Sequence, residues 1–431
     1  MKSSRAICFL IIFLPLLSCT QQSYDCLRAG TPQLEEYAGV YRLYPAMEYD
    51  RGDVPAGYEP VHICHYGRHG SRYILFDSQY VHVMRVLSKA HQDGKLTPLG
   101  EDTYSRYASV YPFLEGREGE LSQVGRAQHK LIAKRMHEEY PEIFGKDPRI
   151  TAVSTTMTRT IMSMGAFCES LKEEDPSLDI FQEASIRNIW YLNPYSSSSP
   201  DVTPEDLVYK SINAPWRPAF HEYIDSLVDT EPFLDRLFAD KVYAEGLCHP
   251  LDFMRDLYSV AVHMHGTEQA EVSFMDVFTD EELALLWECD NITFYIEKGL
   301  DFVDSPRGPE LAGYMLREMI STADAALQQK RPSVALRFGH DGCLMGLYTM
   351  MGLEGWNVKA KDFSDVKNVF QSWRIPMAAN MQLVLWGSAS AEPLVSLYLN
   401  ESICTLPLEP VSTCFYKWSK LTIIELPPAL T

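Results

Sequence analysis

Three short runs of strand-forming residues, each next to a helical pattern, constrain the fold of this chain most strongly. They are Val61–His65, Arg149–Ser154 and Val334–Phe338, and each ends at turn-forming or helix-starting residues. Strands that alternate with helices form α/β domains, in which the crossover connections make the sheet mainly parallel. We therefore predict an α/β fold with a mainly parallel sheet flanked by helices. The 431 residues, 46% of them hydrophobic, are sufficient for a large core.

Helices are predicted in the segments between these runs. One follows Asp77, a second is capped by Ser122, and a third covers residues 309–329. The stretches Leu96–Gly100 and Leu121–Gly125 share the pattern Leu-(Thr/Ser)-x-x-Gly and are interpreted as two helix starts with the same cap chemistry. The residues of the second helix that are predicted to face inward are Val124, Ala127, Leu131 and Met136.

The stretch 165–305 has a different texture, rich in aromatic residues and helical in pattern, with a break at Ser196–Pro200. We interpret it as a helical insertion that covers one face of the sheet, with Trp190, Tyr191 and Trp216 in the core rather than on a ligand platform. The predicted layout is a signal peptide (1–18), a tether and lead-in (19–54), an α/β core (55–164 and 306–431) and a helical cap (165–305).

Reactive side chains stand where the predicted strands end. Arg68–Arg72 follows the first strand, Arg159 follows the second, and His340 and Asp341 follow the third. In parallel α/β sheets, ligands bind outside the carboxyl ends of the strands. We therefore expect these three segments, which are distant in sequence, to converge on one pocket.

The residue types at these strand ends suit a phosphate dianion. Arginine offers permanently charged, forked donors that match phosphate oxygens, and Arg68, Arg72, Arg159 and His340 are the predicted phosphate ligands. Among these cations, the imidazole of His69 is expected to stay neutral and to attack phosphorus, and Asp341 is the natural proton donor to the leaving alkoxide.

Several of these segments resemble the histidine phosphatase superfamily. Arg68–Arg72 looks like its RHGxR signature, and Gly339–Asp341 looks like the HD element of its acid phosphatase and phytase branch. Leu121–Gln128 is similar to the LTxxGxxQ helix start of the family, and Ser154–Arg159 is similar to the segment that supplies its third arginine. The order and spacing of these motifs extend over roughly residues 55–430.

The resemblance implies a phosphoglycerate-mutase-like fold, a covalent phosphohistidine on His69, Asp341 as the acid, and neither a metal nor another cofactor. Within the branch, Pro55–Tyr58, His65–Gly67 and Tyr73 look most like bacterial multiple inositol polyphosphate phosphatases, which implies inositol phosphates such as phytate as substrates. That subfamily commonly carries HAE where this chain has His340-Asp341-Gly342. The difference favours Asp341 as proton donor and leaves a broader acid or sugar phosphatase open.

The first residues resemble an export signal. Lys2 and Arg5 precede the apolar run Ile7–Leu17, which is too short to cross a bilayer as a helix. Leu16–Cys19 resembles a bacterial lipobox, so we predict lipidation of Cys19 and a membrane-anchored lipoprotein that faces the periplasm or the cell exterior. The alternative is an ordinary signal peptide with an incidental cysteine.

The charge balance limits the partners of the chain. With 38 Lys and Arg against 58 Asp and Glu, the formal charge is −20, which argues against a nucleic-acid-binding surface spread over the whole protein. An anionic substrate must instead meet a locally positive pocket. A surface lipoprotein that binds a small phosphorylated ligand without turning it over is the competing function.

Cysteine and histidine positions give two further expectations. Cys404 and Cys414 are the best local disulfide pair, whereas Cys64, Cys168 and Cys343 lie in apolar segments and are expected to be buried free thiols. A metal site is not predicted, because His62 and His65 face opposite sides of a strand and His263-Met264-His265 has no acidic or cysteine partner at fixed spacing.

Overall fold

The computed structural model describes residues 35–46, 49–298, 308–329, 331–356 and 358–421. The predicted signal peptide and the predicted lipidation site Cys19 lie outside these residues. None of the described helices is both long and apolar enough to cross a membrane.

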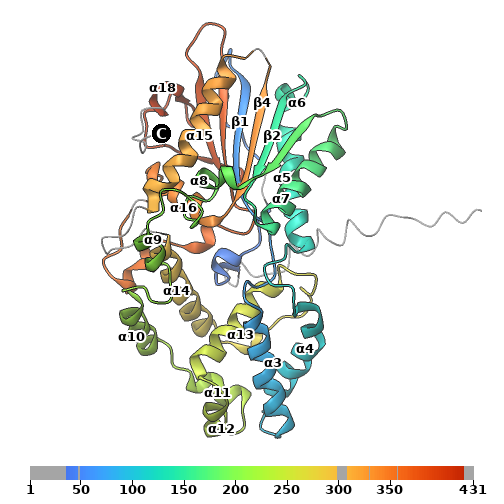
Figure 1. The fold of residues 1–431 in the computed structure, drawn as a ribbon, viewed down its shortest axis with the longest axis vertical. Coiled ribbons are helices and arrows are strands. Elements are labelled where there is room, and N and C mark those ends of the chain that lie inside the picture. Colours follow the sequence, from blue (N-terminus) through green and yellow to red (C-terminus); the bar gives the residue numbers. More distant parts are fainter. Residues whose placement is uncertain (1–34, 47–48, 299–307, 330, 357, 422–431) are drawn as a thin grey trace, which may run out of the picture.

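One sheet organises the upper part of the molecule (Figure 1), and its strand order is β3-β2-β4-β1-β5-β6-β7, with β8 paired to β6. Strands β3, β2, β4 and β1 run parallel, whereas β5, β6, β7 and β8 extend the sheet in antiparallel fashion. The α/β class is confirmed, and all three predicted strands form. The strands are β1 Glu59–Arg68, β2 Arg149–Ser154, β3 Ile180–Ala184, β4 Ser333–Gly339, β5 Asn380–Gly387, β6 Leu394–Leu399, β7 Ser402–Cys404 and β8 Tyr416–Lys417.

Helices cover both faces of this sheet. α5, α6 and α7 lie on one face, and α8, α15 and α16 lie on the other. The remaining long helices form a second, helical lobe in the lower half of Figure 1. The helices are α3 Asp77–Gln92, α4 Pro98–Leu114, α5 Gln123–Glu139, α6 Pro141–Phe144, α7 Thr158–Glu174, α8 Ile189–Leu192, α9 Pro204–Tyr209, α10 Arg217–Leu227, α11 Glu231–Leu237, α12 Lys241–Leu247, α13 Pro250–Met264, α14 Asp280–Glu297, α15 Gly308–Leu327, α16 Asp341–Met350, α17 Val366–Val369 and α18 Trp418–Leu421.

The helical lobe is built from two separate stretches of sequence. α3 and α4 fall within the predicted core segment 55–164, but they pack against α13 and α11. The buried residues of α3, among them Val83 and Leu87, belong to the same apolar cluster as Phe253 of α13. An amphipathic helix is stable where its apolar face is buried. α3 and α4 therefore pack in the helical lobe rather than against the sheet.

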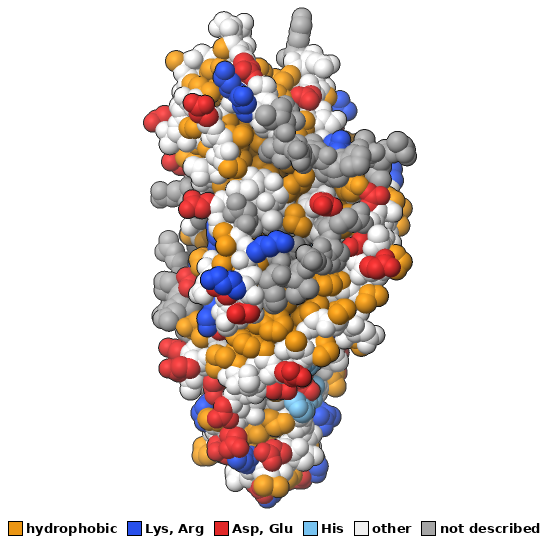
Figure 2. All heavy atoms as spheres, turned by 90° about the vertical axis from the view of Figure 1, so that its left-hand side faces the viewer, with side chains coloured by type: hydrophobic (Ala, Val, Ile, Leu, Met, Phe, Trp, Pro, Cys, Tyr) orange, Lys and Arg blue, Asp and Glu red, His pale blue; other side chains and the backbone are white. Residues whose placement is uncertain are grey.

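The outer surface carries the acidic excess of the chain. On the face shown in Figure 2, Asp and Glu side chains are spread from the sheet-containing part to the helical lobe, with Lys and Arg between them. Elsewhere on the surface, acidic and basic side chains form ion pairs, as in Lys130 with Glu173 at 2.8 Å and Arg106 with Asp276 at 2.9 Å.

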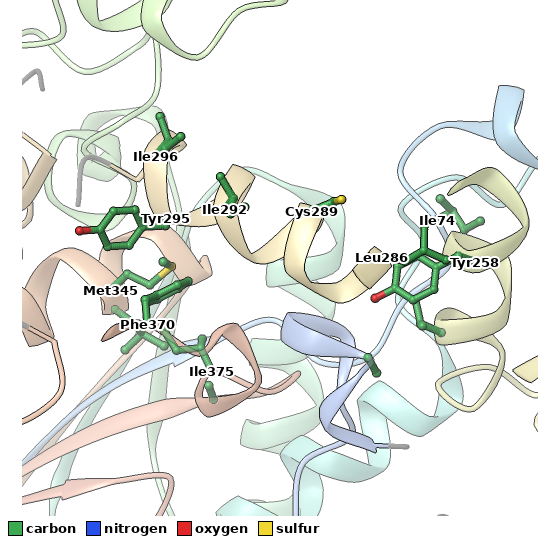
Figure 3. Close-up of a cluster of buried hydrophobic side chains, with 14 of the residues drawn as sticks. Ile74, Tyr258, Leu286, Cys289, Ile292, Tyr295, Ile296, Met345, Phe370 and Ile375 are labelled. Atoms are coloured by element: carbon green, nitrogen blue, oxygen red, sulfur yellow. The ribbon is translucent and has the colours of Figure 1, made fainter. Parts of the chain in front are cut away.

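Helix α14 connects the two parts of the molecule (Figure 3). Leu286 lies beside Tyr258 of α13, whereas Tyr295, farther along α14, lies beside Phe370 and Met345 from the sheet-containing part. The ring centroids of Tyr295 and Phe370 are 5.6 Å apart. Because these side chains are buried, the lobe shares a continuous apolar core with the sheet.

Helix α5 begins where predicted, but it turns a different face inward. The buried residues are Gly125, Gln128, His129, Ile132, Ala133 and Met136. The expectation that Val124, Ala127 and Leu131 face inward is therefore wrong, and only Met136 is confirmed. The reason lies at the first turn, where Gln128 makes hydrogen bonds inside the protein and Gly125 is pressed against another backbone segment.

The shared cap chemistry of the two Leu-(Thr/Ser)-x-x-Gly segments is confirmed. Thr97 caps α4 by accepting the amide of Gly100 at 3.1 Å, and Ser122 caps α5 by accepting the amide of Gly125 at 3.1 Å. Both glycines pack against a neighbouring backbone, which explains why the two segments share the glycine as well as the cap.

The expected disulfide is absent between Cys404 and Cys414, which are both free thiols. Their sulfur atoms point to different neighbours, the carbonyl of Thr405 at 3.6 Å and the carbonyl of Arg51 at 3.8 Å. Cys64, Cys168 and Cys343 are buried free thiols, as predicted.

Replacing Gly125 with alanine should destabilise the protein. The added Cβ would lie 2.2 Å from the carbonyl oxygen of Ser71, so backbone must shift, at a cost of roughly 1–3 kcal/mol. The matched control is Gly165→Ala in α7, where nothing lies within 4 Å of the new Cβ and helix propensity should add about 0.5–1 kcal/mol. Urea denaturation measures both. A Gly125→Ala variant as stable as the parent would contradict this packing.

Candidate active site

The segment Arg68–Arg72 leaves β1 and turns sharply at the end of the sheet. The amide of His69 donates to the carbonyl of Gly339 on β4 at 3.1 Å, and the amide of Ala378 donates to the carbonyl of His69 at 3.0 Å. In the β1–β4 register, Arg68 lies opposite Gly339, so the ends of these two parallel strands are level. This register brings residues separated by about 270 positions to one place.

The start of helix α5 holds this turn in its conformation. The amide of Ser71 donates to Oε1 of Gln128 at 2.9 Å, and Nε2 of Gln128 donates to Oγ of Ser71 at 2.9 Å. Oγ of the N-cap Ser122 donates to the carbonyl of Ser71 at 3.0 Å. A Cβ on Gly70 would lie 2.4 Å from the carbonyl oxygen of Gly125, so the two backbones touch. The Leu121–Gln128 motif therefore acts by positioning the Arg68–Arg72 turn.

The imidazole of His69 is buried with one nitrogen oriented for chemistry. Its Nδ1 lies 3.0 Å from the carbonyl of Gly70, and a carbonyl only accepts, so Nδ1 carries the proton and Nε2 keeps its lone pair. Burial, followed by the charges of Arg159, Arg68 and Arg72, holds the pKa of His69 well below its ordinary value. His69 is therefore neutral at physiological pH, as the sequence predicted.

Arg68 is fully buried and held from several sides. Its Nη1 donates to the carbonyls of Val40 at 2.5 Å and Ile375 at 3.0 Å. Its Nη2 forms an ion pair with Oδ2 of Asp341 at 3.0 Å. Carbonyl acceptors and one carboxylate thus compensate part of the cost of burying this guanidinium.

The three arginines share one feature of their hydrogen bonding. The Nε atoms of Arg68, Arg72 and Arg159 are all buried and have no hydrogen-bond partner among the described residues. Buried polar groups normally find partners, so unpaired donors that carry positive charge indicate a place for an anion. Arg159, the second residue of α7, has its pKa lowered to about 10 by burial and then by the nearby Arg72.

His340 and Asp341 form the turn from β4 into α16. The amide of His340 donates to the hydroxyl of Tyr66 at 3.0 Å, and that hydroxyl donates to the carbonyl of Leu192 at 2.8 Å. The His340 and His69 ring centroids lie 5.7 Å apart. Burial, and then Arg159, lowers the pKa of His340 to about 3, so this imidazole is also neutral.

Asp341 is the first residue of α16, where the helix dipole favours a negative charge. Burial by itself raises the pKa of this carboxyl, but the charges of Arg68 at 3.0 Å and Lys298 at 3.7 Å outweigh burial and hold the pKa well below its ordinary value. The Asp341 side chain is therefore a carboxylate in the free protein.

These groups open into a cavity of about 1040 Å³ between the sheet and the helical lobe. Its lining includes His69, Arg72, Arg159, His340 and Asp341, so the strand ends do converge on one pocket. The lobe adds further basic side chains, namely Lys210, Arg217, Arg255 and Lys298. Among the described residues, no group of three or more His, Cys, Asp or Glu side chains is placed to hold a metal ion.

Several residues of the pocket were not found from the sequence. Tyr41, Lys210 and Lys298 carry no local motif. Lys210 and Lys298 reach the cavity from the lobe, and Tyr41 reaches it from the segment before β1. His263 was considered as a metal ligand, but its Nε2 lies 3.3 Å from Nη1 of Arg72. No sequence pattern indicates that His263 and Arg72 are hydrogen-bond partners, because they are brought together only by the tertiary structure.

Comparison with solved structures identifies the fold. A multiple inositol polyphosphate phosphatase from Bifidobacterium longum, in complex with inositol hexasulfate, matches with a TM-score of 0.75 and 18% sequence identity over 90% of this chain and 97% of that one. The chain has the fold of this phosphatase. The phytase from D. castellii matches with a TM-score of 0.59 and 16% identity over 91% of this chain and 83% of that one. A Hafnia alvei phytase in complex with tartrate matches at 0.52 and 15%, over 87% and 99% of the two chains. No family model and no curated protein sequence matches the chain.

Inorganic phosphate should stabilise the protein by binding at the arginine cluster. At 100 times its Kd, a ligand that binds only the folded state adds about 2.7 kcal/mol. Arg159→Gln should remove most of this gain, whereas Arg149→Gln, at the opposite and exposed end of β2, should leave it intact. Thermal unfolding with phosphate or with chloride at equal ionic strength measures the difference. Equal melting temperatures in the two salts would contradict an anion site.

Proposed function

We propose that this protein is a phosphomonoester hydrolase that works through a covalent phosphohistidine on His69. The observation that carries the proposal is the neutral imidazole of His69, with Nε2 unprotonated, among three arginines whose buried Nε donors have no partner among the described residues. A nucleophile and an anion site are thus combined in one pocket.

Substrate binding is the first step. The phosphate group of the ester lies among Arg68, Arg72, Arg159 and His340, whose N–H groups donate to its oxygens. In a buried site, these fixed charges also stabilise the negative charge that is spread over the transferring phosphoryl group. The turn at Ser71, held by α5, keeps two of the arginines in register with His69.

Phosphoryl transfer then proceeds in two displacements. Nε2 of His69 forms a bond to phosphorus while the bond to the ester oxygen breaks, and the leaving alkoxide takes a proton from Asp341. Water next attacks the phosphohistidine and gives a proton to the Asp341 carboxylate. This second displacement releases inorganic phosphate and restores the neutral imidazole.

The donor must first acquire its proton, because the Asp341 carboxyl is ionised in the free protein. A bound phosphate anion offsets the positive charge of Arg68 and its neighbours, so the pKa of Asp341 rises when substrate enters. A phosphomonoester with a second pKa of about 6 brings one proton with it below that pH. Turnover by this route is therefore favoured on the acid side of neutrality, and the lowered pKa of His69 keeps its imidazole unprotonated to a lower pH than that of an ordinary histidine.

The size and charge of the cavity support one substrate class. A volume of about 1040 Å³ exceeds the need of a single phosphate, and the lining adds Lys210 and, 3.7 Å from Asp341, Lys298 to the positive charge of the arginines. These features support an inositol polyphosphate such as phytate as the substrate. The Bifidobacterium longum phosphatase, which shares the fold, was solved with inositol hexasulfate.

A broader acid or sugar phosphatase is the second candidate. Arg217 is paired with Glu297 at 2.7 Å, and Arg255 is paired with Asp290 at 3.5 Å. These carboxylates neutralise two of the cations on the lobe side and reduce the attraction for a highly charged substrate.

Replacing His69 with alanine should abolish turnover of p-nitrophenyl phosphate. Loss of the nucleophile removes the covalent route, so we expect a decrease in kcat of about 1,000-fold or more. His221→Ala, at an exposed position on α10 outside the lining of the cavity, is the control and should be unchanged. Phosphate release measures the rates, and equal rates for His69→Ala and the parent would end the enzyme proposal in favour of a binding protein.

The same assay separates the substrate classes. For the inositol polyphosphate proposal, kcat/KM on phytate should exceed kcat/KM on glucose phosphate. Release of phosphate from glucose phosphate but not from phytate would leave the broader phosphatase.

Asp341→Asn should slow turnover according to the leaving group. A nitrophenolate leaves without a proton, so the loss should be small, whereas an alkyl phosphate should lose roughly 100-fold or more, the usual contribution of a general acid. Asp252→Asn, a change at another carboxylate of the cavity wall, serves as the control. The comparison of kcat for the two substrates decides, and equal losses on both would argue against the donor role.

A further inference from the structure

Arg72 hydrogen-bonds to a side chain of the helical lobe, whereas Arg68 hydrogen-bonds to backbone carbonyls outside the lobe. Nη1 of Arg72 donates to the carbonyl of its neighbour Tyr73 at 2.9 Å and to Nε2 of His263 at 3.3 Å. His263 belongs to the last turn of α13 in the helical lobe. The guanidinium carbon of Arg72 also lies 5.6 Å from the ring centroid of Tyr41. One edge of the guanidinium is thus occupied by protein, and Nε is left without a partner among the described residues.

The hydrogen-bonding state of His263 is determined by its surroundings. Nδ1 lies 2.7 Å from the carbonyl of Ser259, so Nδ1 carries the proton and Nε2 presents a lone pair to Arg72. Burial, and then the charge of Arg72, keeps the pKa of His263 well below its ordinary value. A neutral imidazole is needed here, because a protonated one has no acceptor for Arg72.

Two more contacts lock this arrangement. The rings of Tyr41 and His263 are stacked at a tilt, with centroids 4.0 Å apart. Nε2 of His265 donates to the carbonyl of Tyr41 at 3.0 Å, which ties residue 41 to the end of α13. Met264, between the two histidines, is buried in the apolar cluster of the lobe. The segment His263–His265 therefore contacts both Tyr41 and Arg72 and holds them next to each other.

We propose that His263 is a positioning residue which, with Tyr41 and His265, fixes the guanidinium of Arg72 for phosphate binding. This role rests on the proposed function, because it takes Arg72 to be a phosphate ligand. The occupied Nη1 edge leaves the Nε side of the guanidinium for oxygens of the anion. The helical lobe thereby sets the affinity of a site whose motifs all lie at the strand ends.

Binding of inorganic phosphate to the full-length protein tests this role without turnover. Titration calorimetry should show about tenfold weaker phosphate binding by His263→Ala, because the hydrogen bond that orders a charged donor is lost. His263→Gln, which keeps an acceptor, should recover part of the affinity. His221→Ala, at an exposed position on α10, should bind as the parent does. Parent-like binding by His263→Ala would overturn the proposal.

A double-mutant cycle separates positioning from a general structural effect. In an Arg72→Gln background His263 has no guanidinium to orient, so His263→Ala should cause no further loss of phosphate affinity. The same tenfold loss in both backgrounds would show that His263 acts elsewhere and overturn the proposal. Tyr41→Leu, which removes the ring that covers His263, provides a second variant and should weaken binding in the parent background only.

The outcome is independent of the hydrolase proposal. If the parent fails to hydrolyse any phosphomonoester but phosphate affinity responds to His263 through Arg72, the enzyme proposal fails and the positioning role stands. If the parent is active and His263→Ala changes neither the phosphate affinity nor KM, the positioning role fails and the enzyme proposal stands.

Discussion

Three guanidinium groups lie close together around a neutral imidazole, and the rest of this structure depends on compensating the electrostatic free energy of that cluster. Like charges removed from water repel one another strongly, and here one carboxylate, Asp341, stands close to the group. The protein meets this cost with backbone carbonyls around Arg68 and with a histidine acceptor beside Arg72. The remaining donors stay unpaired, and a bound phosphate anion would satisfy them.

Close backbone packing at two glycines and hydrogen bonds at the start of two helices fix the position of this cluster. The Arg68–Arg72 turn fits against α5 so closely that neither Gly70 nor Gly125 has room for a Cβ. Tyr66, buried in β1, holds the amide of His340 and so fixes the turn into α16. Side chains whose orientation is determined by such close packing keep their geometry when charge develops, which is the condition for electrostatic catalysis.

The distribution of charge differs between the outer surface and the pocket. The body of the protein is acidic, with a formal charge of −20, and the face in Figure 2 shows acidic groups over its whole length. Inside the cavity, basic side chains from the sheet end and from the lobe face the same space. An acidic exterior disfavours extended polyanions, whereas a small phosphate ester that enters the cavity meets the arginines.

Much of this protein could be predicted from the order of its residues. The three strands and the caps at Thr97 and Ser122 depend on local patterns, because strand alternation and helix capping involve neighbours in the chain. The convergence of the strand ends followed from the rule that parallel strands end at the same edge of a sheet.

Other features depend on contacts between distant segments. The inward face of α5 is set by the hydrogen bonds of Gln128 to Ser71 rather than by its apolar spacing, and α3 joins the lobe because α13 covers its apolar face. Cys404 and Cys414 form no disulfide, and their sulfur atoms instead contact the carbonyls of Thr405 and Arg51, respectively. Residue types and local periodicity thus determined the reactive groups and the class of fold. Only the tertiary structure decided that Tyr41 from the N-terminal segment and His263 and Lys298 from the lobe surround those reactive groups. No local pattern encodes contacts such as Arg72 with His263, which are 191 positions apart.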